Sequence, residues 1–355
     1  MTETPLLEVK SLRLSVRTDE GLARILDHVE LTLPRGRILG VVGESGCGKS
    51  TLARAVLGIV PKTASIDSGE IWFEGENLLG LSDRDMTRRV RGRRIGFIPQ
   101  DPYLALNPVF KIGAQLLPVL RWHAPAQLRT EQDRRAHLVS LLRRVQIPDA
   151  EAVLERYPHQ FSGGQRQRLM IAGALACSPA LVVADEPTTA LDVTTQLQIL
   201  KLLKSLTEEF GTAMLFVTHD FGVVAQLCDA ITVMYAGQTV EAGPTPEVLA
   251  DPRHPYTRAL LACHPDRSDA LTGIPGLVPS PLSPPPGCRF TPRCSVKLTP
   301  STARTASCAP RRPPLTGKCL TRSRTCSSGS LMTRPRAALR RRAARLPSTP
   351  RGARG

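Results

Sequence analysis

The chain has 355 residues, 41% of them hydrophobic and only 4% aromatic, which suits one large or two modest folded domains. No apolar run approaches the roughly 18 residues of a membrane-spanning helix, and no basic stretch precedes an apolar one at the start, so neither a span nor a secretory signal is predicted. The net charge of +16 is concentrated at the end, because residues 270–355 contain 17 Arg and Lys and no Asp or Glu. The missing span and signal predict a cytosolic protein. Because the remainder of the chain is nearly neutral, we expect no basic face for nucleic acid.

Strand patterns recur along the first hundred residues, with apolar residues either alternating or continuous. The strands predicted from them lie at 12–16, 31–33, 38–42, 69–75 and 94–99. One helix is predicted over 50–58, directly after a glycine-rich loop.

The pattern turns helical from about Ile112 to Cys177. Apolar residues over 138–145 fall at helical spacing, and Pro148 ends that helix. The next elements are predicted as a strand over 181–185, a helix over 194–210 and strands over 212–217 and 230–235. Alternating strands and helices predict an α/β fold with parallel core strands, and the helical stretch is an inserted subdomain.

The glycine-rich loop matches the phosphate-loop pattern G-x-x-x-x-G-K-[ST] between a strand and a helix. Its residues are Gly43, Glu44, Ser45, Gly46, Cys47, Gly48, Lys49, Ser50 and Thr51. The glycines allow backbone N–H groups to surround phosphates, and the helix N-terminus favours the negative charge. We expect Lys49 to reach the β- and γ-phosphates and Ser50 to bind Mg²⁺. Cys47 is expected to be a small residue that fits the loop, with a redox role as the alternative.

The buried strand Leu181-Val-Val-Ala delivers two adjacent carboxylates, Asp185 and Glu186, at its end. With a phosphate loop upstream, we expect Asp185 to hold Mg²⁺ through a water molecule and Glu186 to orient or deprotonate the attacking water. The structural alternative is a pair of solvated acids that end a strand.

A second arrangement suited to phosphate begins at Ser162, which is followed by Gly163, Gly164 and Gln165 at the start of a helix. One nucleotide needs only one phosphate-binding arrangement of this kind, so a monomer does not explain why the chain has two. The structural alternative is a serine N-cap followed by flexible glycines.

The segment Tyr157-Pro-His-Gln-Phe-Ser-Gly-Gly-Gln-Arg-Gln-Arg168, followed by Leu181-Val-Val-Ala-Asp-Glu-Pro-Thr-Thr-Ala-Leu-Asp192, resembles the ATP-binding subunit of an ABC transporter. The resemblance covers roughly residues 6 to 294. It implies a P-loop NTPase fold of the ABC type, with an N-terminal antiparallel β subdomain and a helical signature subdomain. It also implies that Ser162–Gln165 faces the ATP that is held by another subunit.

Three further positions match that family. Gln100 matches the glutamine that touches metal and water and leads into the region that contacts the membrane subunits. His219 matches the switch histidine on the γ-phosphate, and Asp192 matches the loop that communicates across the dimer. The alternatives are a hydrogen-bonded loop histidine for His219 and a helix N-cap for Asp192. The aromatic residue on which the family stacks adenine is missing, so the resemblance leaves Val16 or Arg17 for the base.

Several segments resemble the oligopeptide, dipeptide and nickel importer branch, among them 100–108, 157–160, 233–237, 254–257 and 286–294. This branch carries a cysteine-containing C-terminal extension, which in some members holds an iron–sulfur cluster. Cys288 and Cys294 match its first two cysteines. Cys308 lies farther off than the pattern requires, so metal ligation by Cys288, Cys294, Cys308 and Cys319 is left open.

The predicted domains are an ABC nucleotide-binding domain over 1–253, with its helical subdomain at about 103–177, and the branch-specific extension over 254–295. Residues 296–355 are basic and lack a hydrophobic period, so we expect a disordered tail. A segment that binds anionic lipid or nucleic acid and the product of a shifted reading frame are the alternatives for this tail.

The resemblance implies an ATPase that energises uptake of di- or oligopeptides, or a similar small solute, with ATP and Mg²⁺ as cofactors. The expected partners are two transmembrane permease subunits, a second ABC ATPase in a heterodimer rather than a homodimer and, indirectly, an extracytoplasmic solute-binding protein. The expected location is the cytoplasmic face of the membrane. An exporter ATPase, a soluble ABC ATPase without a membrane partner and an inactivated subunit remain alternatives.

Overall fold

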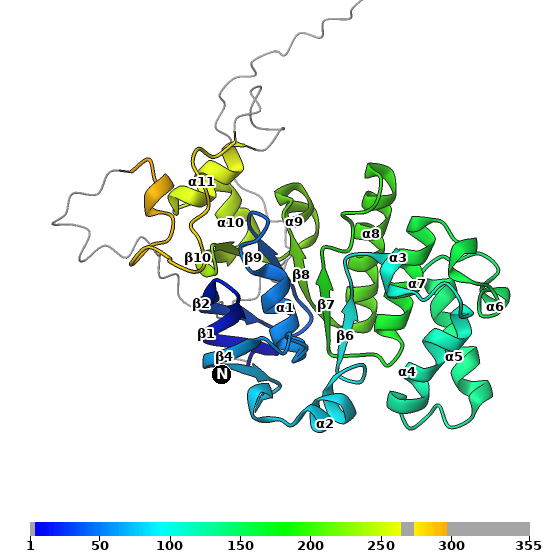
Figure 1. The fold of residues 1–355 in the computed structure, drawn as a ribbon. Coiled ribbons are helices and arrows are strands. Elements are labelled where there is room, and N and C mark those ends of the chain that lie inside the picture. The colour runs from blue at the N-terminus through cyan, green and yellow to red at the C-terminus, as the bar shows by residue number, and fades with distance from the viewer. Residues whose placement is uncertain (1–3, 264–272, 297–355) are drawn as a thin grey trace, which may run out of the picture. The chain divides into compact units, whose positions relative to one another are not determined.

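The computed structural model of the chain describes residues 4–263 and 273–296 (Figure 1). These residues belong to the first of two compact units, Met1–Gly317. The second unit, Lys318–Gly355, lies outside the described residues, as does almost all of the tail that is predicted to be disordered. Among the described residues, no helix combines the length and the apolar character that a bilayer span requires.

Two sheets form the framework of the described part. The first has four strands in the order β2-β1-β4-β5, all antiparallel, and the second has six in the order β10-β9-β3-β8-β7-β6. In the second sheet every pair is parallel except β10 with β9. The strands are β1 (Leu7–Thr18), β2 (Gly21–Leu33), β3 (Ile38–Val42), β4 (Ala64–Phe73), β5 (Glu76–Asn77), β6 (Ile95–Ile98), β7 (Leu181–Asp185), β8 (Ala213–Thr218), β9 (Ala230–Tyr235) and β10 (Gln238–Pro244).

The α-helices of the described residues fall into four groups: α1 after β3, the short α2 between β5 and β6, a helical insertion between β6 and β7, and the four helices that follow β7 (Figure 1). They are α1 (Lys49–Leu57), α2 (Asp83–Asp85), α3 (Pro102–Ala105), α4 (Ile112–His123), α5 (Glu131–Arg144), α6 (Ala150–Val153), α7 (Gly163–Leu175), α8 (Val193–Phe210), α9 (Phe221–Leu227), α10 (Thr245–Ala250) and α11 (Pro255–Ala262). Short η segments cover Leu78–Gly80, Met86–Val90, Pro158–Gln160 and Thr291–Arg293.

The large sheet separates two apolar cores because successive side chains of a strand point to opposite faces. In β7, Leu181 and Val183 join the core that contains α1 and the antiparallel sheet. Val182 and Ala184 join the core on the other face, with residues of α7 and α8. Burial on both faces explains why the strand reads as a continuous apolar run. The predicted fold class is confirmed.

Most element boundaries differ from the predictions by a few residues, for local reasons. The strand predicted at 69–75 begins earlier, at Ala64, because β4 pairs with β1 as far as Val16. The helix predicted from 194 begins at Val193, since the Asp192 side chain caps it. The proline-rich stretch 274–287 contains no helix or strand, yet Pro281 accepts a 2.8 Å backbone hydrogen bond from Arg24 of β2. It is therefore packed against the sheet.

Candidate active site

The phosphate loop joins β3 to α1, and its glycines are required by close contacts. A Cβ atom on Gly43 would lie 2.1 Å from the carbonyl oxygen of Met234, and one on Gly48 would lie 2.8 Å from Leu26 Cδ2. Gly46 and Gly48 have φ values of +78° and +101°, where glycine is favoured. No side chain caps α1 at Gly48. The first N–H groups of that helix therefore point into the loop, as an anion site requires.

Lys49 lies folded over the loop. Its Nζ donates hydrogen bonds to the carbonyl oxygens of Gly43, at 2.8 Å, and Glu44, at 3.0 Å. The same ammonium lies 4.0 Å from Glu186 Oε1, and the Lys49 side chain is only 4% exposed. A buried cation is thus fixed between the phosphate loop and the carboxylate at the end of β7.

The predicted magnesium ligands lie together. Ser50 Oγ donates a 2.8 Å hydrogen bond to Asp185 Oδ1, which joins α1 to the end of β7. Burial raises the pKa of Asp185, and the Ser50 hydrogen bond opposes that shift. Gln100, after β6, donates to Glu186 Oε2 at 3.3 Å. A hydroxyl, a carboxylate and an amide oxygen are hard donors that suit Mg²⁺, so this set fits the ion.

Glu186 is the residue on which the predicted catalytic side chains converge. Its φ of +44° is unusual for a residue other than glycine, and its N–H donates to Val217 O at 2.9 Å. Three side chains approach Glu186 Oε2: Gln100, Thr189 at 3.0 Å and His219 Nδ1 at 3.3 Å. A strained backbone held by this many contacts is typical of functional sites. The site lies at the carboxyl ends of β6, β7 and β8.

The Ser162 segment forms a helix cap. Ser162 Oγ accepts from Gln165 N at 3.3 Å, and Gln165 Oε1 accepts from Ser162 N at 3.0 Å, which is a capping box on α7. A Cβ on Gly164 would lie 2.7 Å from Thr195 Cγ2, and one on Gly163 would lie 2.9 Å from the Tyr103 hydroxyl. In the described residues, no hydrogen bond joins this segment to residues 43–51. Its contact with nucleotide in another subunit stays a prediction.

Asp192 also caps a helix, since its Oδ1 accepts from Thr195 N at 2.9 Å. That hydrogen bond lowers the pKa of Asp192. Because Thr195 also lies close to Gly164, the Asp192 loop and the Ser162 segment are neighbours.

Val16 and Arg17 are the residues predicted to contact adenine. Val16 is half-buried and Arg17 is exposed. Their contact with a base stays a prediction.

The cysteines divide between buried and half-buried positions. Cys47 is buried, and burial raises the pKa of its thiol, which disfavours the thiolate needed for redox chemistry. Cys288 and Cys294 are half-buried, and Cys288 Sγ lies 3.8 Å from His254 Nε2. Within 4–263 and 273–296, no group of three or more His, Cys, Asp or Glu residues could hold a metal. Cys308 and Cys319 lie outside the described residues.

Two further residues touch the phosphate loop, and the sequence patterns gave neither of them a role. Tyr256 of α11 accepts a 2.9 Å hydrogen bond from Glu44 N at its hydroxyl, and Arg293 forms an ion pair with the Glu44 carboxylate at 2.8 Å. Both residues lie inside segments, 254–257 and 286–294, that were noted only as branch-specific motifs. Their position inside those two motifs is the sequence feature that could have pointed to them.

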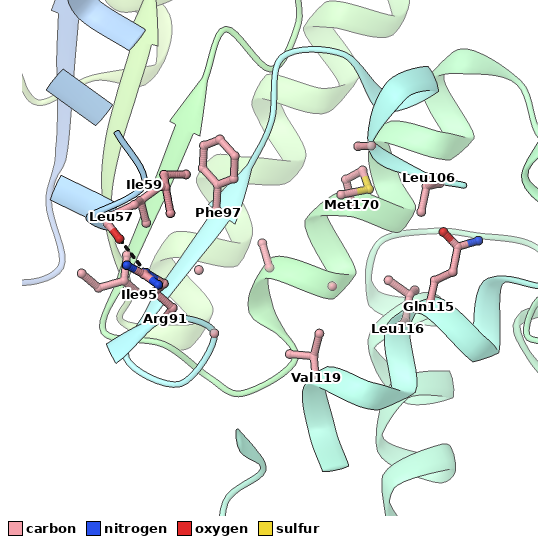
Figure 2. A pocket seen from close by; sticks show the side chains of 15 residues that line it. Leu57, Ile59, Arg91, Ile95, Phe97, Leu106, Gln115, Leu116, Val119 and Met170 are labelled. Carbon is pink, nitrogen blue, oxygen red and sulfur yellow. Dashed lines mark hydrogen bonds between the residues drawn. The ribbon is translucent and has the colours of Figure 1, made fainter. Parts of the chain in front are cut away.

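A groove of about 440 Å³ lies between β6, with residues that follow α1, and the helical insertion. Ile59, Ile95 and Phe97 approach from the core side, while Leu116 and Val119 of α4 and Met170 of α7 face them (Figure 2). The lining is mostly apolar. Four large apolar residues on the connection that follows Gln100 are also exposed, namely Tyr103, Leu104, Val109 and Phe110.

Residues 26–189, which include the phosphate loop, Gln100 and Glu186, match the family model described as ABC transporter. Residues 240–299 match the model of the oligopeptide/dipeptide transporter C-terminal region. A probable peptide ABC transporter ATP-binding protein, y4tR of Sinorhizobium fredii, is 49% identical over 81% of this chain and 87% of its own length. The chain belongs to the ATP-binding subunits of ABC transporters. Its C-terminal region places it in the oligopeptide/dipeptide branch, which confirms the resemblance.

Other relatives and solved structures agree with this ABC family assignment. DdpD of Escherichia coli, a probable D,D-dipeptide transport ATP-binding protein, is 46% identical over 82% of this chain and 88% of its own. The oligopeptide transport protein OppD of Bacillus subtilis is 46% identical over 83% of each chain. A dimeric structure of the ATP-binding cassette MJ0796 with ADP and Pi superposes with a TM-score of 0.60 at 28% identity, covering 67% of this chain and 98% of that one. This ABC subunit is an ATPase.

Proposed function

We propose that this ATPase drives uptake of di- or oligopeptides as one of two motor subunits on the cytoplasmic face of a membrane, bound to two permease subunits. The printed names of the relatives, which concern peptide, dipeptide and oligopeptide transport, support the substrate class. The observation that carries the ATPase role is the convergence of Gln100, Thr189 and His219 on Glu186, 4.0 Å from Lys49. A solute-binding protein outside the cell would deliver the peptide.

In the proposed reaction, the loop N–H groups and Lys49 bind the phosphates of ATP. Ser50, Asp185 and Gln100 are the residues that would hold Mg²⁺, which supplies positive charge against the phosphate oxygens when it is bound. Glu186 accepts the proton of the attacking water. Lys49 and His219 both approach the Glu186 carboxylate, so this carboxylate is already positioned when the water attacks.

The second half of each site is proposed to come from another ATPase subunit. The Ser162–Gln165 segment begins a helix, is not hydrogen-bonded to its own phosphate loop within the described residues and lies beside the Asp192 loop. These features suit a phosphate contact across a dimer. We propose a heterodimer, in which this chain pairs with a similar but distinct ATPase. An iron–sulfur cluster is not included, because Cys288 and Cys294 lack a third described ligand.

The permease contact is proposed at the apolar groove. Ile95, Gly96 and Phe97 of β6 line one side of the groove. Ala105 and Leu106, on the connection that follows Gln100, line it as well. Arg166 lies over the Tyr103 ring at 4.3 Å, which ties this region to the Ser162 helix. A permease segment that fills the groove would therefore touch elements attached to both parts of the nucleotide site.

The test is reconstitution of the purified chain with its genomic ATPase neighbour and both permeases in lipid vesicles. The proposal predicts ATP turnover that appears on mixing, and uptake of a labelled peptide from the side opposite the ATPases. Turnover with transport only from the ATPase side would identify an exporter. Turnover that is indifferent to the permeases would favour a soluble ATPase and contradict the proposal.

A further inference from the structure

The structure assigns a role in nucleotide binding to residues 288–294, here called the C-terminal clasp. We propose that Arg293 of this clasp is a positioning residue, which holds and neutralises Glu44 so that the phosphate loop can accept nucleotide phosphates. The inference rests on the ATP site described above and is independent of peptide transport.

Both terminal nitrogens of the Arg293 guanidinium donate hydrogen bonds to Glu44 of the phosphate loop. Nη1 donates to Glu44 Oε2 at 2.8 Å, and Nη2 donates to Glu44 Oε1 at 3.2 Å, which is a bidentate ion pair. The Arg293 side chain is 4% exposed and the Glu44 side chain is 26% exposed. The hydrogen bond with Glu44 raises the pKa of Arg293 above its usual range. This ion pair is therefore shielded from solvent, unlike a surface pair.

The remaining donors of Arg293 are also occupied. Nε donates to Pro275 O at 3.0 Å, Nη2 to Ile274 O at 2.9 Å and Nη1 to the Tyr235 hydroxyl at 3.3 Å. A lysine has no planar fork that could make all these bonds at once. The guanidinium is thus fixed in one orientation before any ligand arrives.

The clasp itself is anchored by aromatic packing. Phe290 is 2% exposed, and its ring lies 5.2 Å from that of Tyr235 and 5.4 Å from that of Tyr256. Edge-to-face rings at these distances add to the stabilisation from burial. The Tyr256 hydroxyl in turn accepts from Glu44 N at 2.9 Å. Glu44 is therefore held at its backbone by α11 and at its carboxylate by the clasp.

A second route joins the clasp to the same loop. Arg289 is 2% exposed and donates to the carbonyl oxygen of Ala236, in the turn between β9 and β10. The next residue, Gly237, donates from its N–H to Cys47 O at 2.9 Å. The clasp thus contacts the phosphate loop directly at Glu44, and it supports the loop at Cys47 indirectly, through the turn between β9 and β10.

The chemical need for this support follows from the charge on Glu44. A carboxylate at the second position of a phosphate loop would repel the phosphates that the loop must bind, because like charges interact strongly in a partly buried site. Arg293 supplies the opposite charge and holds the carboxylate toward the clasp. The Glu44 carbonyl also accepts from Lys49 Nζ at 3.0 Å. Placement of Glu44 therefore affects the lysine that meets the phosphates.

The test is a double-mutant cycle on the full-length chain, read as the Kd for MgADP by titration calorimetry, which requires neither hydrolysis nor a partner. Arg293→Met is expected to weaken binding about tenfold when Glu44 is present and less than about threefold in a Glu44→Gln background. Arg258→Met is the matched control, since Arg258 lies on α11 and donates to Pro252 O, away from the loop. Thermal unfolding of each variant verifies the fold.

Wild-type affinity in folded Arg293→Met, or an equal loss in both backgrounds, would overturn the inference, because the charge on Glu44 would then be irrelevant. If Arg293→Met does not fold, Arg293→Lys takes its place. MgADP binding that is weaker only when Glu44 is present supports the inference, and the same change in Kd in both backgrounds overturns it. The expected coupling together with absent peptide uptake would overturn the proposed transport function and leave this inference intact.

Discussion

Ser50 and Asp185 are 135 residues apart in the sequence, and a 2.8 Å hydrogen bond joins the Ser50 hydroxyl to the Asp185 carboxylate. This contact connects the first turn of α1 to the carboxyl end of β7. It places two oxygen donors where Mg²⁺ would accompany the phosphates of ATP.

Asp185→Asn should impair the magnesium-dependent part of nucleotide binding. Asparagine keeps an oxygen that can accept from Ser50, so the fold should persist, but the negative charge is lost. We expect the affinity for ATP to fall at least about tenfold in Mg²⁺ and to change little in EDTA. The measurement is equilibrium binding in both buffers. Asp19→Asn, an equal charge change at an exposed position, is the control; equal losses in both buffers would contradict the assignment.

Gly43→Ala should distort the phosphate loop, because the new Cβ would lie 2.1 Å from the Met234 carbonyl oxygen. We expect the free energy of unfolding to drop by about 1–3 kcal/mol and ATP binding to weaken in parallel. Gly80→Ala is the control, since a Cβ there meets nothing within 4 Å. Denaturant titration and nucleotide binding measure both effects, and wild-type behaviour of Gly43→Ala would refute the described contact.

The stability of the extension should depend on pH through His254. Burial lowers the pKa of His254 from its ordinary value near 6.5, with Glu241 opposing the shift, and its Nδ1 accepts from Tyr256 N at 3.1 Å. The unfolded chain therefore binds the proton first as pH falls. The free energy of unfolding should decrease below about pH 6.5, by at most about 1.4 kcal/mol per pH unit, until the folded form is protonated.

His254→Asn retains a side-chain acceptor for Tyr256 N and removes the titration. Urea unfolding between pH 5 and 8 should show a shallower loss of stability in this variant than in the wild-type chain. The Glu241 carboxylate accepts a hydrogen bond from the His254 backbone N–H, and Cys288 Sγ lies 3.8 Å from the ring Nε2; both groups are unchanged in the comparison. Identical pH profiles for both chains would exclude His254 as the group responsible.

Leu104→Asp should weaken assembly with the permeases without affecting the isolated ATPase. Leu104 lies on α3 beside the groove and is 85% exposed, so folding does not depend on it. We expect at least about a tenfold loss of affinity for the permeases, because a charge would enter an apolar contact. Leu277→Asp is the control at an 89% exposed leucine of the extension. Pull-down with detergent-solubilised permeases measures the difference, and equal binding by both variants would exclude α3 from the interface.

Contiguous motifs made much of the fold and the site predictable. The phosphate loop and the pair Asp185–Glu186 could be placed because each is one short segment between a buried strand and its neighbour. The capping alternatives for Ser162 and Asp192 were also drawn from local chemistry, and both caps are present. Their contacts across a dimer depend on a second chain, which a single sequence does not describe.

The contacts between the C-terminal clasp and the phosphate loop were not predictable from contiguous motifs. Arg293 and Glu44 are 249 residues apart, and their contact depends on how the whole extension packs against β2, β9 and α11. The aromatic packing of Phe290 with Tyr235 and Tyr256 determines that arrangement. Phe290 and Arg293 lie outside the strands and helices that the sequence predicts, so no periodic pattern indicated how this segment packs against the loop.

The most direct test of the account is the effect of Glu186→Gln on ATP turnover and on assembly with the neighbouring ATPase. Glutamine keeps the shape of the side chain but cannot take the proton from water, so we expect turnover to fall at least about 100-fold while ATP holds the two subunits in a stable dimer on size-exclusion chromatography. Glu208→Gln, at an exposed position of α8, should behave as wild type. Brisk turnover by Glu186→Gln would contradict the central claim that hydrolysis is carried out at this carboxylate.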